Sequence, residues 1–165
     1  MSNSSVIDLS KLPTPKVIEE LDYEVLFQEY LSDFTARDEE YDGLLESDPA
    51  IIILEVMAYR EMLVRKRINE SAKATLLAFA KGSDLDHILA EYGVPRLDGE
   101  DDDRFRMRGQ MALDGFSTAG PIDAYKFFAL SASVKVKSVD VRSDEPGKVI
   151  VTILSTEGDG TAVRR

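Results

Sequence analysis

The side chains suited to catalysis are few in this sequence, and its single histidine, His87, is the first to consider. It lies in the segment Asp84-Leu85-Asp86-His87, and an imidazole beside carboxylates can act as a general acid or base. The chain has no cysteine, no second histidine and no Gly-x-Ser-x-Gly motif that could complete a catalytic set. We therefore interpret His87 as a surface or capping residue, and we predict no catalytic residue and no enzymatic activity.

Four consecutive acidic residues from Glu100 to Asp103 are the next candidates, because carboxylates bind Ca²⁺ and Mg²⁺. A calcium loop needs ligands at alternating positions around a central glycine, whereas these acids are contiguous and Arg104 follows them directly. Acidic residues in a first helical turn interact favourably with the helix dipole, so a solvated helix start is the better interpretation. Gly158 and Gly160 lack the strand–loop–helix context of a phosphate site. We predict no metal, no cofactor and no small-molecule substrate.

A short basic run at residues 65–67 raises the question of nucleic acid. The chain carries a net charge of −11, and three basic side chains would make few phosphate contacts. A helix–turn–helix spacing is present around Gly93-Val94. In that arrangement, however, the acids at residues 100–103 would lie near the N-terminal end of the recognition helix, where they would repel the DNA phosphates. We predict no nucleic-acid partner. A helical DNA-binding regulator or packaging protein remains the alternative function.

The length and composition indicate a globular chain without targeting segments. The 165 residues suffice for one domain with a core, and 44% of them are apolar. The N-terminus lacks the basic region and apolar run of a signal peptide, and no apolar stretch approaches the roughly 20 residues of a membrane span. We predict no membrane partner.

The strongest structural signal is a long helix over residues 49–81, with Asp48 as its cap and Pro49 in its first turn. At about 100° per residue, two apolar stripes fall on nearly opposite sides of it. The first stripe comprises Leu54, Ala58, Ile68, Ala72, Leu76 and Phe79, and the second Ile52, Val56, Tyr59 and Leu63. Two apolar faces indicate burial between elements or between chains. Glu61 and Arg65, four residues apart within the first stripe, form either an intrahelical ion pair or polar contacts that set the register of a partner helix.

The other elements complete an α+β pattern of about five helices followed by an antiparallel β-hairpin. Helices are expected over residues 14–37, 83–92, 100–116 and 118–132. Alternating valines from Val134 to Val141, with a phase slip between Val136 and Val139, predict a strand with either a bulge or a late start. A turn at Pro146-Gly147 and a second strand at residues 149–154 follow.

These elements divide the chain into three predicted regions. Residues 1–13 form an extended arm, residues 14–132 a helical region, and residues 133–165 the hairpin start of an incomplete α+β region. The candidate partner interface lies on the first two helices and comprises Leu26, Tyr30, Phe34, Ile52, Val56, Tyr59, Glu61, Leu63 and Arg65.

Several longer stretches carry a resemblance to a known family. They are DPA at residues 48–50, LEVMAYRE at 54–61, RINE at 67–70, AFAKGSDLDH at 78–87, GV at 93–94, EDDDRFR at 100–106, FSTAGP at 116–121 and AY at 124–125. Over roughly residues 10–160, the chain resembles baseplate assembly protein J of contractile-tailed bacteriophages, the baseplate wedge family. Because the stretches are long and in order, this resemblance is more specific than the single motifs above.

The resemblance implies a structural role without catalytic residues or cofactors. It implies a wedge subunit that packs through helices with a second copy of itself, with baseplate protein I and with other tail baseplate proteins, in a ring around the tail hub. It also implies assembly in the bacterial host cytoplasm and a final location in the virion tail baseplate. Family members continue beyond the segment at residues 154–160, so the resemblance implies a shortened C-terminus here.

Overall fold

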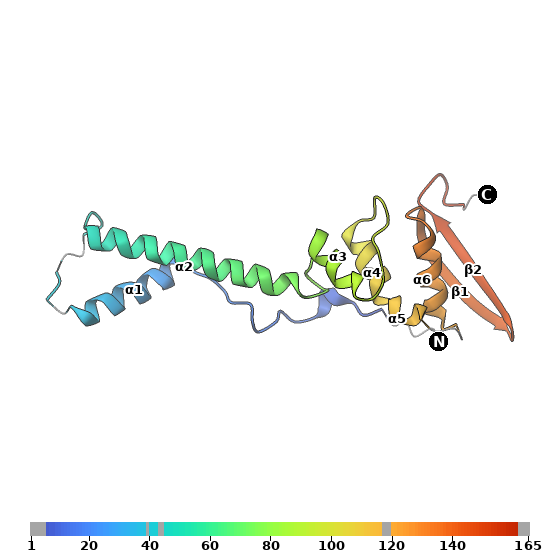
Figure 1. The fold of residues 1–165 in the computed structure, drawn as a ribbon, viewed down its shortest axis with the longest axis horizontal. Coiled ribbons are helices and arrows are strands. Elements are labelled where there is room, and N and C mark those ends of the chain that lie inside the picture. Colours follow the sequence, from blue (N-terminus) through green and yellow to red (C-terminus); the bar gives the residue numbers. More distant parts are fainter. Residues whose placement is uncertain (1–5, 39, 43–44, 117–119, 162–165) are drawn as a thin grey trace. The chain divides into compact units, whose positions relative to one another are not determined.

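A computed structural model describes residues 6–38, 40–42, 45–116 and 120–161, and it confirms the α+β class (Figure 1). A short 3-10 helix precedes the helices and strands, which occur in this order: Leu9–Lys11 (3-10), α1 Tyr23–Arg37, α2 Pro49–Ala74, α3 Gly82–Ala90, α4 Asp102–Gln110, α5 Ala112–Gly115, α6 Ile122–Ala132, β1 Val136–Glu145 and β2 Lys148–Ser155. Two compact units divide the chain. We call Pro13–Lys73 the long-helix unit, and Ala74–Arg165 together with Met1–Leu12 the core unit. The three regions expected from the sequence stay a prediction.

The first helix begins later than expected. The side chain of Asp22 caps α1 by accepting hydrogen bonds from the backbone N–H groups of Glu24 and Val25. Upstream, the N–H of Glu19 donates to Asn69 Oδ1 at 3.1 Å, and Asn69 Nδ2 donates to the Glu19 carbonyl at 2.8 Å. The predicted start near residue 14 is therefore wrong, because the side chain of Asn69 binds backbone groups that a helix would pair internally.

The long helix α2 begins as predicted and ends earlier. Asp48 accepts the backbone N–H of Ala50 at 2.8 Å, which confirms the cap. The helix stops at Ala74 rather than near residue 81. Beyond it, the guanidinium of Arg106 donates to the carbonyls of Leu77 and Ala80, each at 2.7 Å. Because Arg106 satisfies these two backbone carbonyl groups, they do not require the hydrogen bonds of a continued helix.

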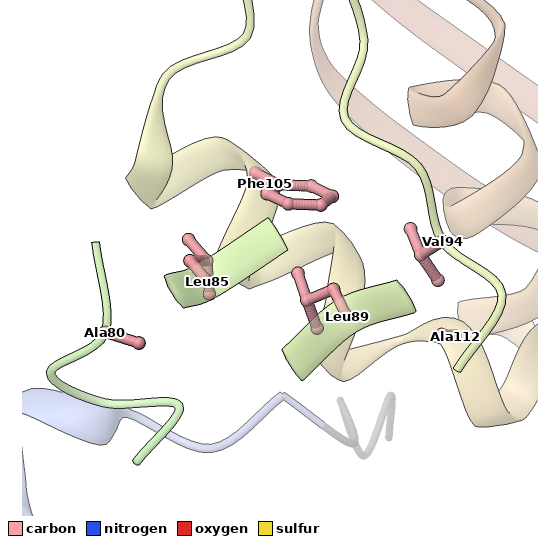
Figure 2. Packing of buried hydrophobic residues seen from close by; sticks show 6 residues of the cluster. All are labelled: Ala80, Leu85, Leu89, Val94, Phe105 and Ala112. Atoms are coloured by element: carbon pink, nitrogen blue, oxygen red, sulfur yellow. The ribbon is translucent and has the colours of Figure 1, made fainter. Parts of the chain in front are cut away.

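The core unit encloses a closed apolar cluster, in which α3 and α4 supply the largest side chains (Figure 2). Leu85, Leu89 and Phe105 have no exposed surface. Gly93, at φ 67°, ends the α3 region as expected. The predicted helix over residues 100–116 is split at Met111 into α4 and α5, which gives six α-helices in the described residues instead of about five.

The acidic run at the start of α4 is not simply a solvated helix start. Asp101 does cap α4 through the Arg104 N–H, but the Glu100 side chain is fully buried. Its carboxylate pairs with Arg104, and Arg108 donates to it at 2.7 Å and 3.0 Å. Arg104 also donates to the Leu130 carbonyl at the end of α6, at 2.7 Å. The first-turn interpretation is therefore wrong for Glu100, which binds the Leu97 N–H in the preceding loop, two arginines of α4 and, through Arg104, α6.

The C-terminal hairpin follows the predicted pattern. β1 and β2 pair antiparallel, β1 begins late, at Val136, and the register shifts between Val136 and Ser138, where the sequence predicted an irregularity. Gly147 has φ 78°, as the third position of a type II turn requires. Helix α6 packs on β1, where Val136 and Val141 are buried (Figure 1).

Candidate partner interface

The inner face of α2 packs against α1 within the long-helix unit. Leu26 of α1 and Ile51, Leu54 and Ala58 of α2 are its buried apolar residues. Tyr30 and Phe34, which share the Leu26 stripe on α1, are half-buried, and the Phe34 ring meets that of Tyr41 edge-on, with 4.9 Å between centroids. The structure thus places the three α1 residues of the predicted interface mainly in contacts within the chain.

A polar network joins the two helices beside this apolar strip. The Tyr30 hydroxyl donates to Glu61, and Arg65 Nε donates to the same carboxylate at 2.7 Å. Arg65 also reaches the carboxylate of Glu19 at 3.4 Å. The hydrogen bond from Tyr30 and the ion pair with Arg65 lower the pKa of Glu61, while its carboxylate raises the pKa of Tyr30. Of the two alternatives for Glu61 and Arg65, this geometry matches the ion pair within the chain.

The opposite side of α2 is apolar and exposed. The four predicted interface residues there are Ile52, Val56, Tyr59 and Leu63, with exposed fractions of 46%, 56%, 50% and 38%. The predicted interface omitted three exposed neighbours, Ile53, Met57 and Val64. Ile68 is also exposed, although the sequence pattern placed it in the first stripe, with Leu54 and Ala58, which are buried. At about 100° per residue these eight side chains span an arc of about 180°. We call them the outer face of α2. The apolar residues at positions 53, 57 and 64 form a third stripe in the sequence, and this stripe could have revealed how wide the outer face is.

Two arginines lie along the middle of this outer face. Arg60 and Arg67 are exposed, and neither guanidinium forms an ion pair within the part of the chain that the structure describes. They are seven residues apart and so project in nearly the same direction, about 10 Å from each other along the helix. The free side of α2 therefore combines apolar and basic groups.

Charge is distributed unevenly within the long-helix unit. Residues 13–48 contain 12 acidic and 2 basic residues, a net charge of −10, which is most of the −11 of the whole chain. Residues 49–73 contain 3 acidic and 5 basic residues, a net charge of +2. The α1 segment and α2 thus present opposite charges to their surroundings.

A cleft of about 310 Å³ opens between α1 and α2 near the start of α2. Its lining combines aromatic, aliphatic and acidic side chains: Tyr23, Glu24, Phe27, Leu31, Glu46, Ile51 and Glu55. The rings of Tyr23 and Phe27 are stacked, with 6.4 Å between centroids. Burial, and then the carboxylates of Glu55 and Glu24, raise the pKa of Tyr23. We call this the α1–α2 cleft.

The residues first considered for chemistry are not brought together. His87 is exposed in the last turn of α3, whereas neighbouring Asp86 pairs with Arg96 at 2.6 Å. Among the described residues, no group of three His, Cys, Asp or Glu side chains is arranged to hold a metal ion. None of the helices in the described ranges is long and apolar enough to cross a membrane.

Comparison with known proteins shows that the sequence is similar to a phage tail baseplate protein. Residues 46–101, which include α2, α3 and the buried Glu100, match the Baseplate J-like N-terminal domain. Baseplate protein J of Escherichia phage P2 is 36% identical over 179 aligned residues, which cover 95% of this chain. The chain spans 59% of the length of that relative. Residues 46–101 of the chain are therefore similar to a Baseplate J-like N-terminal domain, and nearly the whole chain is similar to a phage baseplate protein.

Proposed function

We propose that this chain is a structural subunit of a phage baseplate wedge, and that the outer face of α2 is its assembly surface. The observation that carries the proposal is the exposure of eight apolar side chains along α2, within the segment that matches the family domain. Large exposed apolar surfaces of this kind are typical of protein–protein interfaces. A location in the virion tail baseplate follows from the similarity to a phage baseplate protein.

The width of the outer face indicates more than one neighbour. A helix that packs on one side of a core needs an apolar stripe of roughly 100°, whereas this arc covers about 180° in addition to the face on α1. Two further helices would fill it. A second copy of the chain and a neighbouring baseplate protein, namely protein I, are the partners that the resemblance implies. Wedges built in this way would join into the ring around the tail hub.

A structural role suits the remaining features better than catalysis or DNA binding. His87 has no catalytic partner in the described residues, and the buried ionic groups of the core unit are paired with one another. The net charge of −10 over residues 13–48 would oppose a phosphate backbone.

The test combines substitution on the outer face with assembly. The double variant Val56→Glu/Leu63→Glu places two charges on the outer face without touching the buried side. Co-expressed with the neighbouring baseplate proteins, it should lose at least about tenfold in co-purification, while circular dichroism shows unchanged helix content. The matched control is Val25→Glu, because Val25 is 55% exposed and lies on the opposite helix. Undiminished assembly of the double variant, or a wild-type chain that binds no tail protein, would contradict the proposal.

A further inference from the structure

We propose that the α1–α2 cleft receives an arginine from the outer face of α2 of a second copy, so that copies associate head to tail. This inference rests on the proposed function, because it names the surface against which the outer face of one neighbour packs. The inserted group is Arg60 or Arg67, and its receptor is formed by Tyr23, Phe27 and the carboxylates around them.

The chemistry of the cleft fits a guanidinium on a flexible stem. Phe27, Leu31 and Ile51 offer apolar surface to the methylene groups, and the stacked ring of Tyr23 offers a face to the cation. Carboxylates bind guanidinium groups with paired hydrogen bonds, and three of them line the cleft, at Glu24, Glu46 and Glu55. A volume of about 310 Å³ accommodates one long side chain rather than a helix.

The carboxylates of the cleft lack a cation of their own. Glu46 and Glu55 form no ion pair within the described residues, and Glu24 accepts only the amide of Gln28, at 3.0 Å. A metal ion is a poor alternative occupant, because these acids are not arranged as a ligand group in the described structure. The cleft therefore presents negative charge beside apolar surface without an internal partner.

The complementary groups stand on the same helix but face the other way. From Glu55 to Arg60, five residues at about 100° each turn the side-chain direction by about 140° to the far side. Arg60 and Arg67 therefore cannot reach the cleft of their own copy, whereas the cleft of a neighbouring copy can accept them. The apolar side chains around the two arginines, such as Ile53 and Val64, match the apolar part of the cleft. Charge and apolar surface are thus complementary between copies but not within one.

The resulting contact is heterologous, since the two copies use different surfaces. Heterologous contacts close into rings when the rotation between neighbours permits and otherwise grow into open assemblies. In an open assembly, the unoccupied cleft of the terminal copy would bind the next copy.

Two charge-reversal variants test the contact in the full chain. The cleft variant is Glu46→Lys/Glu55→Lys, and the helix variant is Arg60→Glu/Arg67→Glu. Each alone should weaken self-association at least about tenfold in sedimentation experiments, because like charges then meet. An equimolar mixture of the two variants should restore association, since each then finds an opposite charge on the other. Circular dichroism checks that both variants keep their helices.

A matched control separates the cleft from net charge. Glu29→Lys/Asp33→Lys changes the net charge as much as the cleft variant does, but on exposed positions of α1 outside the cleft. It should leave self-association within about twofold of the wild type. The inference is overturned if the control weakens association equally, or if the mixture of variants fails to associate.

Other outcomes separate this inference from the proposed function. If Val56→Glu/Leu63→Glu abolishes assembly while both charge variants associate normally, the outer face is an interface but the cleft is not its receptor. If the wild-type chain binds other tail proteins but never itself, this inference falls and the proposed function stands. If the wild-type chain neither self-associates nor binds tail proteins, both fall.

Discussion

The apolar cluster around α3 and α4 in the core unit is more completely enclosed than the apolar side chains of the long-helix unit. In the core unit, Leu85, Leu89 and Phe105 are completely enclosed, and even the charged Glu100 and Arg108 are buried against each other. In the long-helix unit few apolar side chains are buried, and the outer face of α2 remains exposed. Because apolar burial is the main favourable term in folding, the enclosed cluster stabilises the core unit, whereas the long-helix unit would gain stability from a partner that covers the outer face of α2.

The largest expected effect comes from the buried ion pair of the core unit. Glu100→Ala leaves the Arg108 guanidinium buried without its carboxylate, and removing one partner of such a pair costs about 3–5 kcal/mol. Urea unfolding should show this loss in the free energy of unfolding. The control Asp98→Ala removes an exposed acid from the same loop and should change it by less than about 0.5 kcal/mol. A loss below about 1 kcal/mol for Glu100→Ala would show that the ionic group is not part of the stable core.

The same carboxylate predicts the direction of acid sensitivity. Burial tends to raise the pKa of Glu100, but Arg108, the Leu97 N–H and Arg104 together lower it below its ordinary value of 4.5. A lowered folded-state pKa means that this stabilisation is present above the unfolded-state pKa and is lost as the pH falls through the folded-state value. The free energy of unfolding should therefore decline below about pH 5. Glu100→Gln should flatten that decline relative to the wild type.

The contrast between the units can be tested directly with one pair of identical substitutions. Leu89→Ala empties a fully enclosed position in the core unit and should cost about 2–5 kcal/mol. Leu63→Ala, on the outer face of α2, should change the stability of the isolated chain by less than about 0.5 kcal/mol. Thermal unfolding of both variants measures the difference. Similar costs at the two positions would mean that α2 is already covered in the isolated chain.

A smaller effect is expected inside the long-helix unit. Tyr30→Phe removes the hydroxyl that donates to Glu61 and should cost about 0.5–1.5 kcal/mol, the usual range for one hydrogen bond. Hydrogen exchange of the α1 amides should become faster, while that of α3 should not change. Tyr59→Phe, on the exposed side of α2, is the matched control. Unchanged exchange in α1 would indicate that the apolar strip alone holds the two helices together.

The types of the elements were largely predictable from the sequence, but several helix ends were not. The cap at Asp48 and the irregularity near Val136 were confirmed because they depend on local residues. The start of α1 was wrong because Asn69, fifty residues from Glu19, binds the backbone of that residue. In the same way, Arg106 binds the backbone beyond α2. Local patterns contain no information about such distant donors and acceptors.

The sequence by itself determined the α+β class, the hairpin and the presence of more apolar surface on α2 than one contact can cover. Hydrophobic period and turn residues act over a few positions, so these features follow from neighbouring residues. Only the tertiary structure decided which side of α2 packs against α1 and which stays exposed. It also decided that Glu100 is buried while Arg60 and Arg67 remain without ion pairs in the described residues. Burial and charge pairing depend on which distant segments fold against each other, and periodicity along the chain cannot specify that.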